Sequence, residues 1–237
     1  MHTVLSPCGD LEMSPANIIA RAQEEGLNMI AISDHNCTRQ VKLIQKLGRE
    51  KGILVIGGAE VTTKEETHAL AFFETDEQLD AFQVFLKEHL PHIPNDEDRF
   101  GYQLVLNEEE EIVDEEPYLL INAIDVDLDG IYEKVHEIGG LFIPAHVNKT
   151  STSLMSQLGF VPPDIKADAL EINKFTTKEA FLKKFAYLKK FSFIKSSDAH
   201  FPVNIGEAYC TFHMYDLTFD EFRRTLRKED GRYIDDV

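Results

Sequence analysis

The most constraining feature of the sequence is an alternation of short apolar runs with stretches of helical periodicity. The apolar runs are short enough to be buried strands, and they lie at 29–32, 53–56, 69–73, 141–143, 169–172 and 191–194. Helices are expected between them, at about 15–25, 38–49, 76–89, 128–138 and 178–190. Because strands and helices alternate along the whole chain, we expect an α/β fold, either a single parallel-sheet barrel or an open sheet.

One segment interrupts the alternation, an acidic insertion at about 91–118 that includes the run Glu108 to Glu111. A block of like charges usually stays in solvent, which favours a solvated helix or loop face over a cation-binding role. No internal repeat or linker separates two units. We therefore expect a single domain over residues 1–237.

Charge and cysteine content narrow the classes of function. Forty-two acidic residues against 24 basic ones give a net charge of −18, which repels polymeric nucleic acid and anionic lipid but is compatible with a small anion in a cationic pocket. Cys8, Cys37 and Cys210 are odd in number and far apart, so a reducing compartment is favoured over a disulfide framework. No apolar run approaches the roughly 20 residues that span a bilayer. We expect a cytoplasmic protein with no membrane contact.

Side chains that bind metals follow the predicted strands. His35, Glu60, His146, Asp198 and His200 each come just after an apolar run. In a β/α barrel the carboxyl ends of the strands converge on one face, so these residues should meet there. Imidazole and carboxylate are ligands of Zn, Mn and Fe, and a carboxylate can bridge two ions. The pattern predicts a multinuclear metal site.

Six short motifs around these residues also occur in a fixed order. They are HTVLSPCGD at 2–10, ISDHN at 32–36, GAE at 58–60, TH at 67–68, PAH at 144–146 and SDAH at 197–200. Together the motifs resemble those of the polymerase and histidinol phosphatase (PHP) family. The resemblance implies a distorted seven-stranded TIM-like (β/α) barrel, two to three divalent transition metal ions at its mouth, and hydrolysis of phosphate esters.

The resemblance also implies three sets of ligands. They are His2, Glu60 and Asp198 for one ion, Glu60, His68 and His146 for a second, and His35 with His200 for a third. The family usually begins with a strand that carries His-x-His, and here His2 matches the second histidine while Met1 holds the middle position. Since the first imidazole has no counterpart in the printed sequence, we expect the ion at His2 to be held most weakly.

Asp10 and Cys8 are alternatives for the remaining ligand of the third ion. A thiolate would suit Zn, whereas a carboxylate suits Mn or Fe. Asp10 is preferred, because a lone cysteine is more commonly a small buried residue than a ligand.

Three further residues are candidates for a direct part in the reaction. Asp34 either orients a ligand or caps the end of a strand, with equal support for both. Arg39 and Lys149 follow His35 and His146 closely, so they should lie on loops at the same mouth. Each could hold a phosphate, Arg39 through two parallel contacts and Lys149 as a point charge, or could be a solvated cation.

The expected function is therefore metal-dependent hydrolysis of a small phosphate monoester of the nucleotide, sugar phosphate or histidinol phosphate type. A non-catalytic binding or scaffold domain is the alternative. The missing first histidine supports it, and the presence of five other metal-type residues opposes it: Glu60, His68, His146, Asp198 and His200. A nuclease is disfavoured by the net charge of −18 and by the lack of a stripe of Lys and Arg. The substrate and the oligomeric state are left open.

Overall fold

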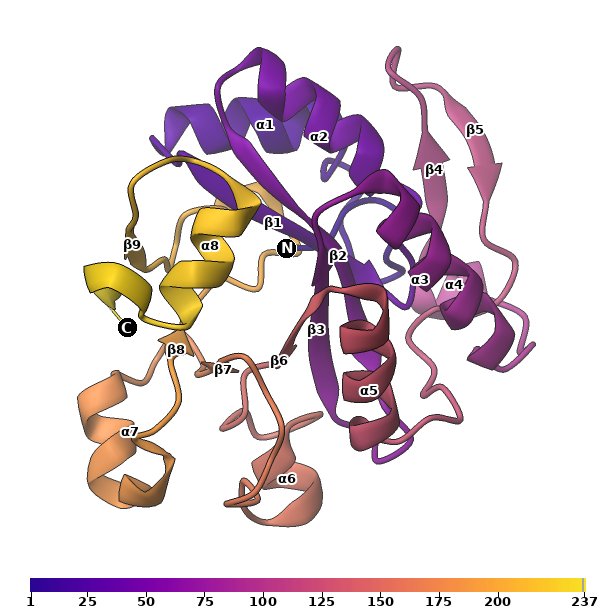
Figure 1. The fold of residues 1–237 in the computed structure, drawn as a ribbon. Helices are drawn as coiled ribbons and strands as arrows, with labels where there is room; N and C mark the ends of the chain where they lie inside the picture. The colour runs from indigo at the N-terminus through magenta and orange to yellow at the C-terminus, as the bar shows by residue number, and fades with distance from the viewer. Residues whose placement is uncertain (236) are drawn as a thin grey trace.

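The strands of the computed structural model, which describes residues 1–235 and 237, follow the apolar runs closely. They are β1 (Met29–His35), β2 (Leu54–Thr62), β3 (His68–Phe73), β4 (Leu104–Leu106), β5 (Ile112–Glu115), β6 (Leu141–Pro144), β7 (Leu170–Glu171), β8 (Phe193–Ile194), β9 (Thr211–His213) and β10 (Tyr233–Asp235). Each of the six predicted strands is present (Figure 1). Four more short strands lie in the acidic insertion and near the C-terminus.

Helices of the described residues lie in all five predicted stretches, although the one expected at 178–190 ends at Lys184, and three further helices lie outside the predicted stretches. The helices are α1 (Pro15–Glu24), α2 (Val41–Glu50), α3 (Asp76–His89), α4 (Glu97–Phe100), α5 (Leu128–Ile138), α6 (Leu154–Leu158), α7 (Lys178–Lys184) and α8 (Phe219–Leu226), with 3₁₀ turns η1 (Ala186–Leu188), η2 (Pro202–Asn204) and η3 (Glu229–Gly231). Side-chain caps explain several of the starts: Ser14 accepts a hydrogen bond at the start of α1, and Thr75 forms a capping box with Gln78 at α3. Within residues 1–235 and 237, no helix is long and apolar enough to cross a membrane.

The main sheet has the order β1-β2-β3-β6, and one of its strands runs against the expected direction. β1 and β2 are parallel, but β3 is antiparallel to both β2 and β6. The expectation of an all-parallel sheet is therefore wrong at β3. The reason is the short connection after Thr62, which turns back through a hydrogen bond from the Thr63 amide to the Thr67 carbonyl. A parallel crossover needs a dozen or more residues, so a link this short must make a hairpin.

The reversal of β3 decides where its histidine lies. In the β2–β3 ladder Thr62 pairs with His68, and Glu60 pairs with Leu70. The first residue of β3 therefore lies at the edge of the sheet where β2 ends. Gly58 permits the close approach of the two strands, because a Cβ added there would meet the Ala71 carbonyl oxygen at 1.8 Å.

Backbone hydrogen bonds connect further segments of the chain to the two edges of this sheet. The parallel pair β7-β8 adjoins β6, since the Asp168 amide donates to the Phe142 carbonyl. At the other side the Met1 amino group donates to Ala31 in β1, and the His2 amide donates to the Ala199 carbonyl. The first two residues thus join β1 to the segment after β8. The strands of the described residues form one four-stranded sheet and three two-stranded sheets, with helices between them, as expected for an α/β fold. The closed seven-stranded barrel stays a prediction.

Three hydrophobic clusters hold these layers together. The largest packs α1, α2, α3 and α5 against β1, β2 and β3, a second joins β3 and β6 to α8, and a third joins β7 and β8 to α7. Figure 1 shows α1 and α2 beside β1 and β2, with α8 on the side where β9 lies. The C-terminal part of the chain therefore packs on the same sheet as the N-terminal part, although the expected single domain over 1–237 stays a prediction.

The acidic insertion contains the short helix α4 and a β hairpin that is held by basic residues. β4 and β5 pair antiparallel, and all four residues of β5 are exposed. Glu108 forms an ion pair with Lys46, while Asp114 and Glu116 both form ion pairs with Arg39. The run Glu108 to Glu111 is exposed and lies in the turn between β4 and β5, so the expected solvated loop face is confirmed.

A buried ion pair anchors the C-terminus. The Arg232 guanidinium donates to both carboxylate oxygens of Glu221 in α8, at 2.6 and 2.7 Å. Both residues are buried. The Arg232 guanidinium lowers the pKa of Glu221 from 4.5 to about 2. The two parallel hydrogen bonds join η3 and β10 to α8.

Replacing Glu221 by Gln should lower the melting temperature, and the loss should depend on pH. The pKa of Glu221 is depressed in the folded protein, so its stabilising effect is complete above about pH 4.5 and is lost as the pH falls towards 2. Thermal unfolding of Glu221→Gln and of the original protein should therefore differ at pH 7 and converge at low pH. Glu179→Gln is the matched control, since that carboxylate is 81% exposed and pairs only within α7. An equal effect of the two substitutions would contradict the anchoring role.

Candidate metal centre

The carboxylate of Glu60 lies at the centre of the candidate site. It is 3% exposed, and its oxygens are surrounded by the imidazoles of four histidines. The distances from these oxygens to the ring nitrogens are 3.4 Å for His2, 3.6 Å for His35, 3.2 Å for His68 and 3.4 Å for His146. Because β2 ends here while β3 begins here, one sheet edge collects residues from five segments of the chain.

Two groups of ligand atoms form around this carboxylate. His2, Glu60 and Asp198 bring one ligand atom each within 4.8 Å of one another, and this set is the one expected for the first ion. His35, Glu60 and His68 do the same. The expected second set had His146 in place of His35, and the His146 ring lies beside that of His68, with centroids 5.3 Å apart.

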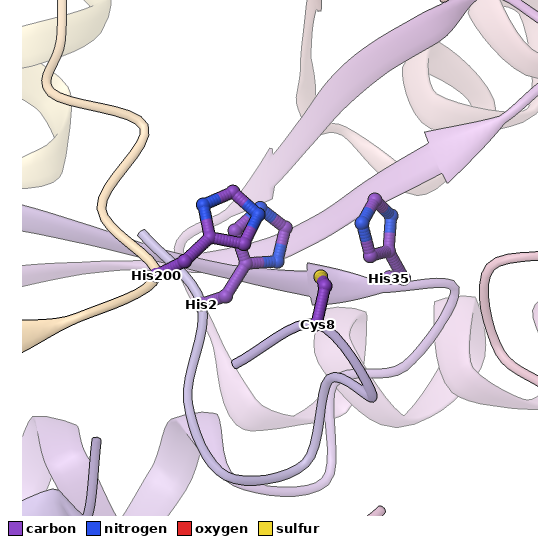
Figure 2. Close-up of side chains that lie close together, drawn as sticks. All are labelled: His2, Cys8, His35 and His200. Atoms are coloured by element: carbon purple, nitrogen blue, oxygen red, sulfur yellow. The ribbon is translucent and has the colours of Figure 1, made fainter. Parts of the chain in front are cut away.

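A third group contains Cys8. The Cys8 sulfur and the imidazoles of His2, His35 and His200 lie within 4.8 Å of one another and point towards a common space (Figure 2). Asp10, preferred over Cys8 from the sequence, joins none of the groups found among residues 1–235 and 237. Its carboxylate accepts a hydrogen bond from the Glu12 amide instead, within its own turn. The loop thus brings the thiol to the site and directs the acid away from it.

The state of the histidine nitrogens fits a cation site. Among the described residues, His35 Nδ1, His68 Nδ1 and both ring nitrogens of His146 are buried without a hydrogen-bond partner. Buried polar atoms are normally paired, so several unpaired imidazole nitrogens around one carboxylate need an explanation. A divalent transition metal supplies one, because a neutral imidazole binds such an ion through its free lone pair.

Hydrogen bonds behind the site fix which nitrogen of two histidines faces it. His2 Nδ1 lies 3.0 Å from Ser6 Oγ, and Ser6 Oγ donates to the Asp34 carboxylate at 2.7 Å. The hydroxyl proton is used by Asp34, so His2 must donate from Nδ1, and its Nε2 is the nitrogen that faces Glu60 and Asp198 and that would bind a metal ion. His200 has the same arrangement, with Nδ1 2.8 Å from the Asp198 carbonyl oxygen.

The charges of the site are unbalanced without a cation. Burial alone would lower the pKa of His2, but the Asp198 and Glu60 carboxylates raise it to about 9. Burial and the neighbouring His2 lower the pKa of His35 well below its usual value and that of His200 to about 4. Burial opposes ionisation of Glu60, yet the surrounding imidazoles, His68 first, hold its pKa well below the usual value. Without a metal, His2 therefore holds a proton between two ionised carboxylates, and a metal ion that binds there would take the place of this proton.

The backbone is strained at the strand ends that carry these groups. The φ angles of Asn36, His146 and Asp198 are 45°, 27° and 50°, in the left-handed region that residues other than glycine rarely adopt. Such conformations cost about 1–3 kcal/mol each and cluster at functional sites. Two of these residues are candidate ligands and the third follows the candidate ligand His35, which supports a function for this edge of the sheet.

The three candidates for a direct part in the reaction lie in different places. Asp34 is fully buried behind the site, where its carboxylate accepts hydrogen bonds from the Thr3 amide, the Thr3 hydroxyl and Ser6. It therefore holds the loop that positions His2. The Arg39 guanidinium donates to the hairpin carboxylates of Asp114 and Glu116, and its role as a phosphate ligand stays a prediction beside that of a surface cation. Lys149 does lie at the site, with Nζ 2.9 Å from Asp198 Oδ2.

Sequence reasoning missed two residues that the structure brings to the site. Ser6 connects His2 to Asp34, and its position four residues after His2 in the first motif was the available signal. Glu171 ends β7, is 4% exposed, and accepts hydrogen bonds from the His146 amide and the Ser196 hydroxyl. Its place after an apolar run is the pattern that identified Glu60. Burial raises the pKa of Glu171.

With this geometry described, comparisons with known proteins identify the class. The PHP domain model matches residues 1–148, and the model of a PHP-associated region matches 182–230. The chain belongs to the PHP domain family, as the six motifs indicate. No curated protein sequence matches the chain.

Solved structures show the same fold at low identity. The chain is similar to the lesion-specific endonuclease Q of Pyrococcus furiosus, with 22% identity and a TM-score of 0.71 over 99% of this chain and 56% of that one. An endonuclease Q complex with a 27-mer duplex carrying an abasic lesion matches with 22% identity and a TM-score of 0.72, over 98% of this chain and 56% of that one. An amidohydrolase from Chromobacterium violaceum, solved with sulfate and no metal, matches with 16% identity and a TM-score of 0.61 over 92% and 90%. The chain thus spans little more than half of the endonuclease.

The Ser6→Ala variant should bind metal about 10–100-fold more weakly, the range typical for loss of a residue that orients a ligand. Without the hydroxyl, His2 loses the partner that fixes its ring, and the His35 amide loses an acceptor 3.1 Å away. A competition titration with a chelator measures the affinity, and a melting curve checks that the variant folds. The exposed Ser151 provides the control substitution, Ser151→Ala. Unchanged metal affinity in folded Ser6→Ala would exclude the positioning role.

Proposed function

We propose that the protein is a metal-dependent hydrolase of phosphate esters and that its substrate is a small phosphorylated molecule. The arrangement that carries the proposal is the Glu60 carboxylate enclosed by four imidazoles at one sheet edge in a chain of the PHP family. The proposed ligands are His2, His35, Glu60, His68, His146, Asp198 and His200, with Cys8 preferred to Asp10 on geometry. Zn, Mn and Fe all remain compatible with this mixed donor set.

Each part of the chain has a task in such a reaction. Bound divalent ions would supply Lewis acidity, neutralising phosphate oxygens and activating water. Glu60 and the imidazoles hold the ligand atoms at fixed separations, while Asp34 and Ser6 keep His2 oriented from behind. Lys149 lies at the exposed side of the site, where its ammonium group can contact a phosphate oxygen. Asp198 holds that ammonium group in place through an ion pair, and its negative charge and that of Glu60 raise the pKa of Lys149 although burial alone would lower it.

A second candidate function is cleavage of a phosphodiester in damaged DNA. It is supported by the similarity to endonuclease Q over 99% of this chain. The net charge of −18 opposes independent binding of a duplex, because phosphates are attracted by basic surfaces. The remaining part of that endonuclease has no counterpart in these 237 residues. A small phosphate ester is therefore the substrate class that the chain itself supports better.

Elemental analysis and substrate screening test the proposal directly. Protein purified without chelator, or reconstituted in turn with Zn, Mn and Fe, should contain at least two metal ions per chain. The loaded protein should hydrolyse members of a panel of small phosphate monoesters faster than a duplex with an abasic site. Metal content below one equivalent per chain would contradict the hydrolase proposal and favour a non-catalytic binding or scaffold domain. Faster cleavage of the duplex would select the nuclease.

Glu60→Gln should reduce metal content and lower the hydrolysis rate by at least about 10–100-fold, since loss of a ligand should cost no less than loss of a residue that orients one. The amide keeps the shape of the side chain and removes the charge that the four imidazoles surround. Glu109→Gln in the exposed hairpin is the control and should match the original protein. Equal activity in the two variants would remove Glu60 from the site.

A further inference from the structure

A side hollow lies next to the metal centre, between the loops that follow β6 and β7. It has a volume of about 940 Å³, including the space open to solvent. Its lining residues are Asn148, Met155, Asn173, Phe175, Thr176, Thr177, Ala180, Phe181, Lys184 and Phe185. Figure 1 shows α6 and α7, which contribute part of this lining, at the end of the molecule where β7 and β8 are found.

Chain connectivity brings the side hollow close to the proposed reaction centre. Asn148 lines the hollow and is two residues from His146, so their Cα atoms are at most about 7–8 Å apart. The next residue, Lys149, reaches Asp198 with its ammonium group. On the other wall, Asn173 is two residues from Glu171. One molecule could therefore place a phosphate at the metal centre and its organic part in the side hollow.

The polar groups of the side hollow are fixed by hydrogen bonds to one another. The Asn148 amide nitrogen donates to Thr176 Oγ1 at 3.0 Å, and Thr176 Oγ1 donates to Asn173 Oδ1 at 2.9 Å. The Asn173 backbone amide donates to Asn148 Oδ1 at 2.8 Å. Each Asn side-chain amide has two N–H groups, and at least one of them takes no part in these three hydrogen bonds. The hollow therefore presents oriented donors, which suit a ligand with acceptor atoms at its edge.

The charge of the side hollow differs from that of the protein as a whole. None of the described residues that line it is acidic, and Lys184 adds a positive charge. This absence is informative in a chain with 42 acidic and 24 basic residues. An acceptor-rich or anionic ligand is thus favoured there over a cation.

Phe175 gives the side hollow an exposed aromatic wall. Its side chain is 86% exposed, more than any other large hydrophobic residue among those described. The loop that carries it is held by an ion pair of 2.6 Å between Lys174 and Glu207. An exposed ring on a fixed loop loses little freedom when a flat ring stacks on it, and such stacking contributes favourably to binding of a base.

We propose that the side hollow binds the base of a nucleotide whose phosphate lies at the metal centre. A nucleobase combines a flat aromatic face for Phe175 with edge acceptors for Asn148, Asn173 and Lys184. The sugar that links the base to the phosphate would let one molecule occupy both sites, which lie on neighbouring residues of the same loop. This inference rests on the proposed function and narrows its substrate class to nucleotides.

Calorimetric titration of the full chain with adenosine 5′-monophosphate and with ribose 5-phosphate tests the inference, because the two ligands differ only in the base. The nucleotide should bind about 5–100-fold more tightly, as expected for one stacked base. Phe175→Ala should remove most of that difference and leave ribose 5-phosphate binding unchanged. Lys184→Gln should weaken only the nucleotide. Tyr215→Ala is the control, since Tyr215 is also largely exposed, at 77%, and belongs to no wall of the side hollow.

The outcomes separate this inference from the proposed function. Equal affinity for the two ligands, or an advantage of the nucleotide that survives Phe175→Ala, overturns the side hollow as a base site even if both esters are hydrolysed. A Phe175-dependent preference for the nucleotide supports it. If that preference is found but the metal-loaded protein hydrolyses neither ester, the hydrolase proposal fails while nucleotide binding stands.

Discussion

The organisation of this protein depends on one unfavourable interaction, the burial of a carboxylate away from water. Glu60 is removed from solvent at the end of a central strand, and such a charge is stable only when positive or polar groups surround it. Four imidazoles fill that role, and they come from the first residues, β1, β3 and the end of β6. The strands that pack around the core are therefore also the supports that bring the donors together. Fold and site satisfy the same electrostatic requirement.

Residues behind the site, Asp34 and Ser6, hold the imidazole of His2 in position next to Glu60. Asp34 has no contact with the open side of the site, yet its three hydrogen bonds hold the loop from Thr3 to Ser6 in place. Through Ser6 this carboxylate determines which nitrogen of His2 faces Glu60. Lys149 and Asp198 form the opposite wall, which is more exposed. The site thus has a rigid buried side that positions ligands and an open side where a substrate can enter.

Sequence periodicity predicts this protein's elements well because buried strands and amphipathic helices leave strong local signals. The helices over 76–89 and 128–138 have the predicted bounds as α3 and α5. Strand direction leaves no such signal, since the run 69–73 reads the same in either direction, and only the short connection before His68 indicates a hairpin. The candidate ligands are recognisable for the same reason as the strands, because each follows an apolar run or lies in a family motif.

Residue roles that depend on distant partners were not predictable. Arg39 follows His35 by four residues, but its guanidinium is taken up by hairpin carboxylates more than 70 positions away. The choice between Cys8 and Asp10 depends on how a tight loop turns, and two residues of difference are enough to direct one side chain into the site and the other out of it. Nothing in the local pattern specifies either outcome.

The contact between His2 and the segment after β8 has a consequence for how the molecule is made. His35, Glu60 and His68 lie on three consecutive strands, so their part of the site can form while the rest of the chain is still being synthesised. His2 is different, because its amide bonds to Ala199 and its ring approaches Asp198. His2 is synthesised long before Asp198 and Ala199, so these contacts exist only after the segment that follows β8 has been added. Contacts of such long sequence separation form late and slow the search for the native state. Biosynthesis therefore completes the metal centre late, at a residue that was translated before all the other candidate ligands.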